Sequence, residues 1–378
     1  MIKRMIEITA CCLAWLLIRP FFLARSLRAV PVKKIDRILV LAWGGIGNAL
    51  LFTPALKNLR KAMPRATIAA IVSQHGAREV LEGSGLVDTV VMAAAETVRG
   101  AYAIAHTVAA PDKTTLFVCM AGIDPIAGSI LSFRSRARYR VGENGRMEGF
   151  LYTHSIRVDP AKHEVVRNLD LLKRVGIPAE DDELVFPVPD DIRRAIRATL
   201  AREWGIAPER LISIAPGSGA KQLFKRWPAE YFAALARGLS SRGFAVALIG
   251  DKGERALCEE IQLTAGEGVY NMSGRFSMTE TAAIIGSSRL VVSNDSALMH
   301  IAAALKVPVV AIFGPTLPCK NAPWKVPHKI MRIALPCSPC YRFRPVECPY
   351  ELKCLRDLKP ADVMRAAEEL GRETGGLL

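Results

Sequence analysis

The sequence predicts an α/β protein made of two doubly wound domains that face one cleft. From residue 36 onward, short runs of aliphatic and β-branched residues alternate with helical patterns, which is typical of βαβ units around a parallel sheet. The acidic, proline-rich stretch PAEDDELVFPVPDD, residues 178–191, interrupts this alternation, which then restarts. A chain of 378 residues is long enough for two such cores. We therefore expect one domain over residues 31–185 and a second over 186–378.

The expected elements alternate along both halves. In the first half we expect strands at Ile38–Ala42, Thr67–Val72, Thr89–Met92 and Leu116–Met120, and helices from Ala49, Gly76 and Asp124. In the second half we expect strands at Leu211–Ala215, Phe244–Ile249, Leu290–Ser293 and Val307–Phe313, and helices from Pro228, Gly253 and Ser296. Ligands of open α/β sheets bind at the edge where parallel strands end, so the turns after these strands are the candidate sites.

Residues 1–30 are expected to form a hydrophobic helix that associates with a membrane. Residues 1–40 carry eight basic and two acidic side chains, but the uncharged run from Ile8 to Ile18 is only eleven residues long. About twenty apolar residues are needed to cross a bilayer. We therefore expect an interfacial or re-entrant anchor on anionic lipid, with an ordinary packed helix as the alternative.

The charge balance restricts the class of partner. The chain has 51 Lys and Arg against 36 Asp and Glu, a net charge of +15, which favours phospholipid or phosphorylated ligands. It has neither zinc-finger spacing nor an aromatic RNA-binding signature, so we expect no nucleic acid partner. Five arginines in SFRSRARYRVGENGR, residues 132–146, indicate either a solvated helix end or a surface for lipid phosphates.

The stretch LAWGGIGNALLFTPALKNLR, residues 41–60, reads as a strand, a glycine turn and a helix. Gly45 and Gly47 free the backbone so that its N–H groups can face an anionic ligand. A dinucleotide fingerprint would need a third glycine at Leu50 and a carboxylate near Ser73-Gln74-His75, and both are missing. NAD is therefore not expected.

The second half carries a stronger signal for phosphate in APGSGAKQLFKRWP. Gly217 and Ser218 offer N–H groups and a hydroxyl, while Lys221, Lys225 and Arg226 supply charge. A pyrophosphate would find both kinds of donor in this loop. The alternative is a loop with a solvated basic edge.

Two further turns carry polar side chains. Glu254, in GDKGER, could accept hydrogen bonds from a ribose diol or stabilise a helix N-terminus. In NDSALMH, Asp295 stands at a helix start with Ser296 and Ala297, and His300 follows one turn later. Asp295 would bind hydroxyls or cap the helix, whereas a lone histidine at His300 is more often a packing residue.

Taken together, GGIGNALLFTPALKNLR, PGSGAKQLFKRWP, GDKGER and NDSALMHIAAAL…VAIFGPT resemble glycosyltransferase family 9, the bacterial lipopolysaccharide heptosyltransferases, over about residues 36–365. The resemblance implies a GT-B fold of two Rossmann-like domains, with the acceptor on the N-terminal one and the nucleotide-sugar on the C-terminal one. It implies inverting transfer from an ADP-heptose-like donor to a lipid-linked glycan, with no cofactor required for catalysis. It also implies a peripheral or monotopic enzyme on the cytoplasmic face of the inner membrane.

The resemblance also implies roles for individual residues. Lys225 would bind the diphosphate of the donor and Glu254 its ribose, with Gly217 and Ser218 in the same donor-binding loop. Asp295, Ser296 and Ala297 would line the donor sugar and the diphosphate, with His300 behind them. Gly45 and Gly47 fall in the acceptor loop. The family usually has an Asp acting as general base where this chain has Asn48.

An amide cannot serve as a base near neutral pH, but it can orient a hydroxyl. We therefore expect Asn48 to orient the acceptor and Asp124 to supply the base, with His106 and Glu143 as further candidates. The alternative is a non-catalytic relative that binds a sugar nucleotide or a glycolipid.

The segment 337–354 is rich in cysteine. Cys337, Cys340, Cys348 and Cys354 have a spacing that suits a structural zinc site, while a disulfide or free thiols are the alternatives.

Overall fold

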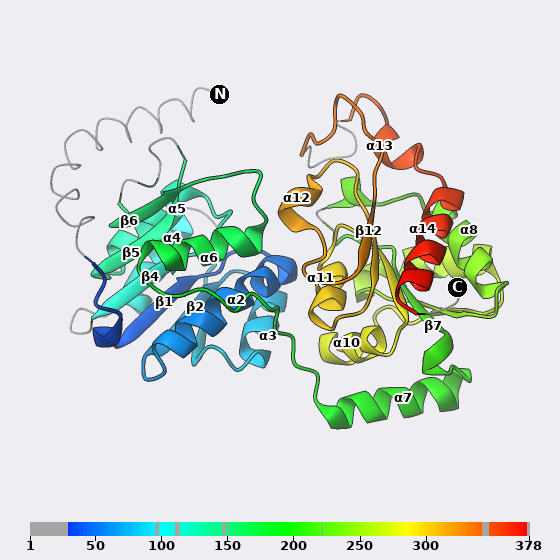
Figure 1. The fold of residues 1–378 in the computed structure, drawn as a ribbon, viewed down its shortest axis with the longest axis horizontal. Coiled ribbons are helices and arrows are strands. Elements are labelled where there is room, and N and C mark those ends of the chain that lie inside the picture. The colour runs from blue at the N-terminus through cyan, green and yellow to red at the C-terminus, as the bar shows by residue number, and fades with distance from the viewer. Residues whose placement is uncertain are drawn as a thin grey trace. The chain divides into compact units, whose positions relative to one another are not determined.

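A computed structural model describes residues 29–94, 98–109, 114–145, 149, 151–220, 222–341 and 348–375. The chain divides into two compact units, Met1–Val185 and Phe186–Leu378, which are described separately below (Figure 1). The expected N-terminal helix lies outside the described residues up to residue 28. Among the described helices, none combines the length and the apolar character needed to cross a membrane.

The first unit contains a six-stranded parallel sheet in the order β3-β2-β1-β4-β5-β6. Its strands are β1 (Arg37–Leu41), β2 (Thr67–Val72), β3 (Thr89–Met92), β4 (Thr115–Cys119), β5 (Tyr139–Asn144) and β6 (His154–Arg157). β4 is buried along its whole length and β1 beyond its first residue, as expected for central parallel strands covered on both faces. The strand order reverses between β1 and β4, which makes their carboxyl ends the switch point of this sheet.

Helices cover the sheet of the first unit. They are α2 (Ile46–Ala62), α3 (His75–Gly83), α4 (Val98–Val108), α5 (Pro125–Arg134) and α6 (Glu164–Arg174), after a short 3-10 turn η1 (Val32–Lys34). α2 lies against α3 and α6, and α4 lies against α5. The amphipathic α6 buries Val165, Leu169 and Leu172, and this packing places its first turn at the carboxyl edge of the sheet.

The second unit repeats the arrangement with the order β12-β11-β10-β7-β8-β9, again all parallel. Its strands are β7 (Leu211–Ala215), β8 (Ala245–Leu248), β9 (Val269–Asn271), β10 (Leu290–Asn294), β11 (Val309–Ile312) and β12 (His328–Met331). The switch point of this sheet lies between β7 and β10. Two doubly wound parallel sheets confirm the α/β prediction.

The helices of the second unit pack in a similar way. They are α7 (Asp190–Trp204), α8 (Ala229–Ser240), α9 (Arg255–Ala265), α10 (Met278–Gly286), α11 (Ala297–Ala304), α12 (Pro318–Asn321), α13 (Lys353–Arg356) and α14 (Pro360–Glu373), with 3-10 turns η2 (Pro208–Arg210), η3 (Leu223–Lys225) and η4 (Lys252–Glu254). α8 lies between α9 and α14, and α10 lies against α7 and α11. Buried Trp227, whose indole donates to the Leu358 carbonyl at 2.9 Å, joins the loop before α8 to the loop before α14.

Several boundaries differ from the expectation. α2 begins at Ile46 instead of Ala49, because the turn is completed by Gly44 at φ +124° and Gly45 is already the N-cap. α9 begins at Arg255, after η4 has absorbed Gly253. β11 begins at Val309, since Pro308 has no N–H for the ladder.

The proline-rich stretch before the second unit is bound to α2. The Asn58 amide donates to the Asp181 carbonyl at 2.5 Å, and the Thr53 hydroxyl accepts from the Val185 N–H at 2.9 Å. Lys57 forms an ion pair with the Asp181 carboxylate at 2.7 Å. The last residues of the first unit are therefore held by side chains of one helix.

Candidate functional site

Most of the donor residues expected from the sequence gather at the switch point of the second sheet. β7 is followed by the loop with Gly217 and Ser218, and the neighbouring β10 is followed by Asp295 and Ser296. β8, on the other side of β7, is followed by the turn that carries Glu254. Three strand ends thus present these side chains at one edge, where open α/β sheets bind ligands.

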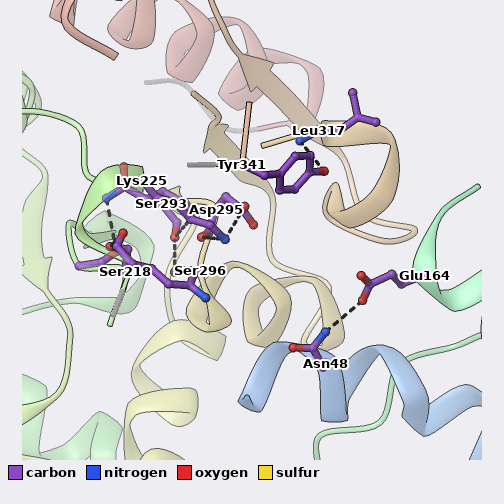
Figure 2. A network of polar contacts seen from close by, with 12 residues as sticks. Asn48, Glu164, Ser218, Lys225, Ser293, Asp295, Ser296, Leu317 and Tyr341 are labelled. Carbon is purple, nitrogen blue, oxygen red and sulfur yellow. Dashed lines mark hydrogen bonds and ion pairs between the residues drawn. The ribbon is translucent and has the colours of Figure 1, made fainter. Parts of the chain in front are cut away.

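A buried ion pair lies at this edge. The Lys225 ammonium, at the end of η3, is 2.8 Å from the Asp295 carboxylate, and the two side chains are 12% and 4% exposed (Figure 2). The same ammonium also reaches the Asp295 carbonyl at 3.5 Å. Because both charges are nearly buried, each holds the other in place. A ligand that displaces one member of the pair could bind the charge of the other.

Glu254 lies directly under the loop that follows β7. Its carboxylate accepts hydrogen bonds from the N–H groups of Gly219, at 2.9 Å, and Asp251, at 3.3 Å, and lies 3.5 Å from the Arg226 guanidinium. An ideal Cβ at Gly217 would lie 1.9 Å from Glu254 Oε1. Only a glycine at position 217 therefore allows the carboxylate to lie against this loop.

Asn294 organises the edge and was not identified from the sequence. Its amide donates to the carbonyls of Pro216, at 2.7 Å, and Gly217, at 3.3 Å, while its carbonyl accepts from the Trp227 N–H at 3.1 Å. Asn294 thus ties the end of β10 to the loop after β7 and to the KRWP segment. The sequence offered one signal for this role, since Asn294 is a polar residue at the end of the apolar run that forms the buried strand β10.

The N-terminus of α11 lies at the same edge of the sheet, directly after β10. Ser296 is its N-cap in extended conformation, and no side chain in the described chain caps the first turn, which begins at Ala297. The Ser296 hydroxyl pairs instead with that of Ser293 at 3.0 Å. The first N–H groups of α11 are therefore not engaged by a capping side chain and can face an anion. His300 is buried in this helix, 3% exposed.

Ser218 is positioned differently from the expectation. Its hydroxyl donates to the Gln222 carbonyl at 2.7 Å and so shapes its own loop. Lys221 lies outside the described residues.

Asn48 lies at the switch point of the first sheet, in the first turn of α2. Its amide donates to Glu164 Oε2 on α6 at 3.2 Å, and Figure 2 shows the two side chains pointing toward each other. An ideal Cβ at Gly44 would lie 2.9 Å from Asn48 Oδ1, so the glycine makes room for this amide. Gly45 is the N-cap of α2 and Gly47 lies within its first turn. Glu164 was missed by the sequence analysis.

The other expected carboxylates have structural partners. Asp124 is the N-cap of α5, where Oδ1 accepts from the N–H groups of Ile126 and Ala127, each at 2.9 Å. Glu143 is buried, forms a two-pronged ion pair with Arg167 at 2.7 and 2.5 Å, and accepts from the Gly122 N–H. Glu143 is therefore engaged through both oxygens and is unsuited to be a base.

The surroundings of Glu143 also affect Arg167. Burial would lower the pKa of the guanidinium, but the hydrogen bonds and charge of Glu143, with a contribution from Glu164, raise it overall. The side chain of the further candidate His106 lies outside the described residues.

The four clustered cysteines line one small cavity together with Pro315. Within the described residues, however, no three His, Cys, Asp or Glu side chains are arranged to hold a metal ion. Burial, and then the neighbouring Cys348, Cys340 and Cys337, raise the pKa of the Cys354 thiol to about 11. The described side chains do not fit the expected four-thiolate zinc site.

The arginine-rich segment divides into two parts. Arg134, Arg136 and Arg138 are exposed, in keeping with a solvated basic surface. Arg140 is buried, and its guanidinium donates to the carbonyls of Leu151, at 2.9 Å, and Ala137, at 2.8 Å. Arg140 therefore belongs to the core and not to that surface.

Comparison with known proteins agrees with the motif resemblance. The model for glycosyltransferase family 9 (heptosyltransferase) matches residues 124–350. Lipooligosaccharide heptosyltransferase 2 of Campylobacter jejuni is 33% identical over 167 residues, which cover 43% of this chain and 51% of the relative. The chain thus matches about half the length of this curated relative.

Solved structures share the fold. A glycosyltransferase family 9 protein from Veillonella parvula has a TM-score of 0.75 at 22% identity, covering 92% of this chain and all of its own. The ADP-heptose lipopolysaccharide heptosyltransferase II of Escherichia coli has a TM-score of 0.67 at 20% identity, covering 90% of this chain and all of its own. The GT-B arrangement of two parallel-sheet domains is therefore the fold that this chain shares with them.

Proposed function

The chain belongs to glycosyltransferase family 9, and from this premise we propose that it transfers a sugar, a heptose, from a nucleotide-sugar to a hydroxyl of a lipid-linked glycan such as the lipopolysaccharide core. The observation that carries the proposal is the carboxyl edge of the second sheet, where the segments after the neighbouring strands β7, β8 and β10 carry Lys225, Glu254, and Asp295 with the start of α11. Such a set offers groups for a diphosphate and for the hydroxyls of a ribose or a sugar.

We assign the donor to the second unit. The ammonium of Lys225 and the first N–H groups of α11 provide positive charge for the diphosphate, so no metal ion is needed to stabilise it as a leaving group. Glu254, fixed under Gly217, is the acceptor for the ribose hydroxyls, and Asp295 binds sugar hydroxyls once Lys225 turns to the phosphate. Adenine and heptose are proposed because the structural neighbour in E. coli is named for ADP-heptose.

We assign the acceptor to the first unit. Asn48 orients the acceptor hydroxyl at the switch point, and the hydroxyl oxygen displaces the diphosphate with inversion at the anomeric carbon. A carboxylate near this hydroxyl would take its proton, and Asp124 is the candidate that the sequence provides.

We propose that the protein works at the cytoplasmic face of the inner membrane, as a peripheral or monotopic protein. Residues 1–30 supply eleven uncharged residues in sequence between basic flanks. The exposed Arg134, Arg136 and Arg138 add positive charge on the first unit, which favours an anionic leaflet.

A screen of nucleotide-sugars tests the proposal. The purified chain is heated with ADP-heptose, ADP-glucose, UDP-glucose or GDP-mannose, and the largest rise in melting temperature is expected with ADP-heptose. Heptose-deficient lipopolysaccharide is then added, and mass spectrometry is expected to show one added heptose. A stabilised protein that never modifies an acceptor would favour the binding-protein alternative, for which Asn48 is the motivating observation. A protein that no nucleotide-sugar stabilises would contradict the donor assignment.

A further inference from the structure

Among the described residues, three carboxylates lie near the carboxyl edge of the first sheet, and they have different hydrogen-bond partners. Both oxygens of Glu143 accept hydrogen bonds from Arg167, so this carboxylate neutralises a buried cation. Asp124 uses Oδ1 to cap α5. The third carboxylate, Glu164, contacts the side chain of Asn48 itself.

Glu164 lies where the two central strands of the sheet end. Oε2 accepts the hydrogen bond from Asn48, which belongs to the turn after β1. Oε1 lies beside Gly122 in the turn after β4, 3.7 Å from where a Cβ would be. The carboxylate therefore bridges both sides of the switch point, which is the place where doubly wound sheets bind their ligands.

The position of Glu164 in its helix suits a charged carboxylate. It is the first residue of α6, and the N-terminus of a helix is favourable to negative charge. The preceding His163 accepts the Val165 N–H at 3.2 Å, so the cap of this helix is supplied by another side chain. Arg167, one turn further along α6, forms an ion pair with Glu143, and its charge also interacts with Glu164.

We propose that Glu164 is the general base of the transfer and that Asn48 positions it, an inference that rests on the proposed function. The acceptor hydroxyl gives its proton to a Glu164 oxygen while its own oxygen bonds to the anomeric carbon. The bond from that carbon to the diphosphate oxygen breaks, and the nucleoside diphosphate leaves with the electron pair. Glu164 then releases the proton to water. Asn48 donates its amide hydrogen to Oε2 and fixes the carboxylate at the edge.

The test exchanges the two side chains. The full chain is assayed for release of ADP from ADP-heptose with heptose-deficient lipopolysaccharide as acceptor, and ADP affinity is measured by calorimetry. We expect the rate of the parent to decline at acid pH, as Glu164 becomes protonated. Glu164→Gln is expected to lower kcat by about 10²–10⁴-fold with unchanged ADP affinity, and to lose this decline. The exposed Glu79→Gln on α3 is the matched control, with parental kcat.

The double variant Asn48→Asp with Glu164→Gln separates a base from a structural partner. It keeps the hydrogen bond across 3.2 Å with donor and acceptor exchanged, and it returns a titratable group to the switch point. We expect a kcat at least about tenfold above that of Glu164→Gln, with the acid decline restored. If Glu164→Gln does not fold, the double variant alone serves as the test. It should then show acceptor-dependent turnover whose rate declines at acid pH.

Three results would overturn the inference. Glu164→Gln could keep the parental kcat, or the folded double variant could show no higher kcat than Glu164→Gln. Either result would mean that Glu164 only holds Asn48 in place. Asp124→Asn could abolish the acid decline, which would make Asp124 the base. In each case the parent still transfers sugar, so the proposed function stands. A parent that binds ADP-heptose but never transfers sugar would refute the proposed function and this inference together.

Discussion

The carboxylate of Glu254 lies in the space that a side chain at position 217 would fill, so only glycine fits at Gly217. An ideal Cβ at Gly217 would lie 1.9 Å from Glu254 Oε1, far closer than atoms can approach, although the two residues are 37 positions apart. The carboxylate in turn accepts the Gly219 N–H at 2.9 Å and so shapes the loop after β7. The conformation of the proposed phosphate loop and the position of the proposed ribose acceptor therefore depend on one another.

Replacement of Gly217 by alanine should disturb both the conformation of the loop after β7 and the position of the Glu254 carboxylate. We expect Gly217→Ala to lower the free energy of unfolding by about 1–3 kcal/mol, since Glu254 must move to relieve the overlap. It should also weaken ADP-heptose binding, because the carboxylate leaves its position. The matched control is Gly83→Ala on α3, where a Cβ meets nothing within 4 Å. Chemical denaturation and calorimetry measure the two effects, and parental values for both would mean that the loop does not depend on this contact.

Lys225 is expected to contribute directly to diphosphate binding. Lys225→Met should weaken ADP binding by about 1.5–3 kcal/mol, the range for hydrogen bonds to charged groups. The variant also leaves the 4%-exposed Asp295 carboxylate without its cation, so a lower melting temperature is expected as well. Lys33→Met, at an exposed position in η1, is the control. Equal ADP affinity in Lys225→Met and the parent would remove Lys225 from the donor site.

The ion pair between Lys57 and Asp181 should give the stability a specific pH dependence. The hydrogen bond from Lys57 is the main cause that lowers the pKa of Asp181. A carboxyl whose pKa is lower in the folded state stabilises the fold above its unfolded pKa, and this contribution is lost as the pH falls through the folded pKa. Asp181→Asn should therefore be less stable than the parent at neutral pH, with a smaller difference at about pH 3. Urea unfolding at both values measures this, and a constant difference would contradict it.

Removal of residues 1–28 should release the protein from membranes. The described strands of both sheets lie between Arg37 and Met331, so the remaining chain is expected to fold. Flotation of the parent and of the shortened chain with vesicles containing anionic lipid compares the two. Continued flotation of the shortened chain would assign membrane binding to the exposed Arg134, Arg136 and Arg138 or to another basic surface.

Much of the fold was predictable because it is encoded locally. β2, β3 and β7 begin and end where the sequence predicts, since each is a short apolar run between turn signals. β12 (His328–Met331) was missed because its strand is short and half-buried, with no clear alternation. The start of α2 was misplaced because the spacing of Gly44, Gly45 and Gly47 does not reveal that, of these three, only Gly44 takes a positive φ.

The site was predictable only where its residues lie in one motif. Lys225, Asp295 and Ser296 were identified from local sequence, but the contact of Asn48 with Glu164 joins residues 116 positions apart. Asn294 was overlooked for a similar reason, since its partners lie 67 to 78 positions away. Such pairs depend on how α6 and β10 pack, which no local pattern encodes.

Acceptor-dependent release of ADP tests the central claim most directly. The purified full chain is mixed with ADP-heptose, and ADP is measured with and without heptose-deficient lipopolysaccharide. A glycosyltransferase should release ADP in step with the heptose that appears on the acceptor, and should release little without it. Tight binding of ADP-heptose with no acceptor-dependent ADP would contradict the claim and identify a protein that binds the nucleotide-sugar without transferring it.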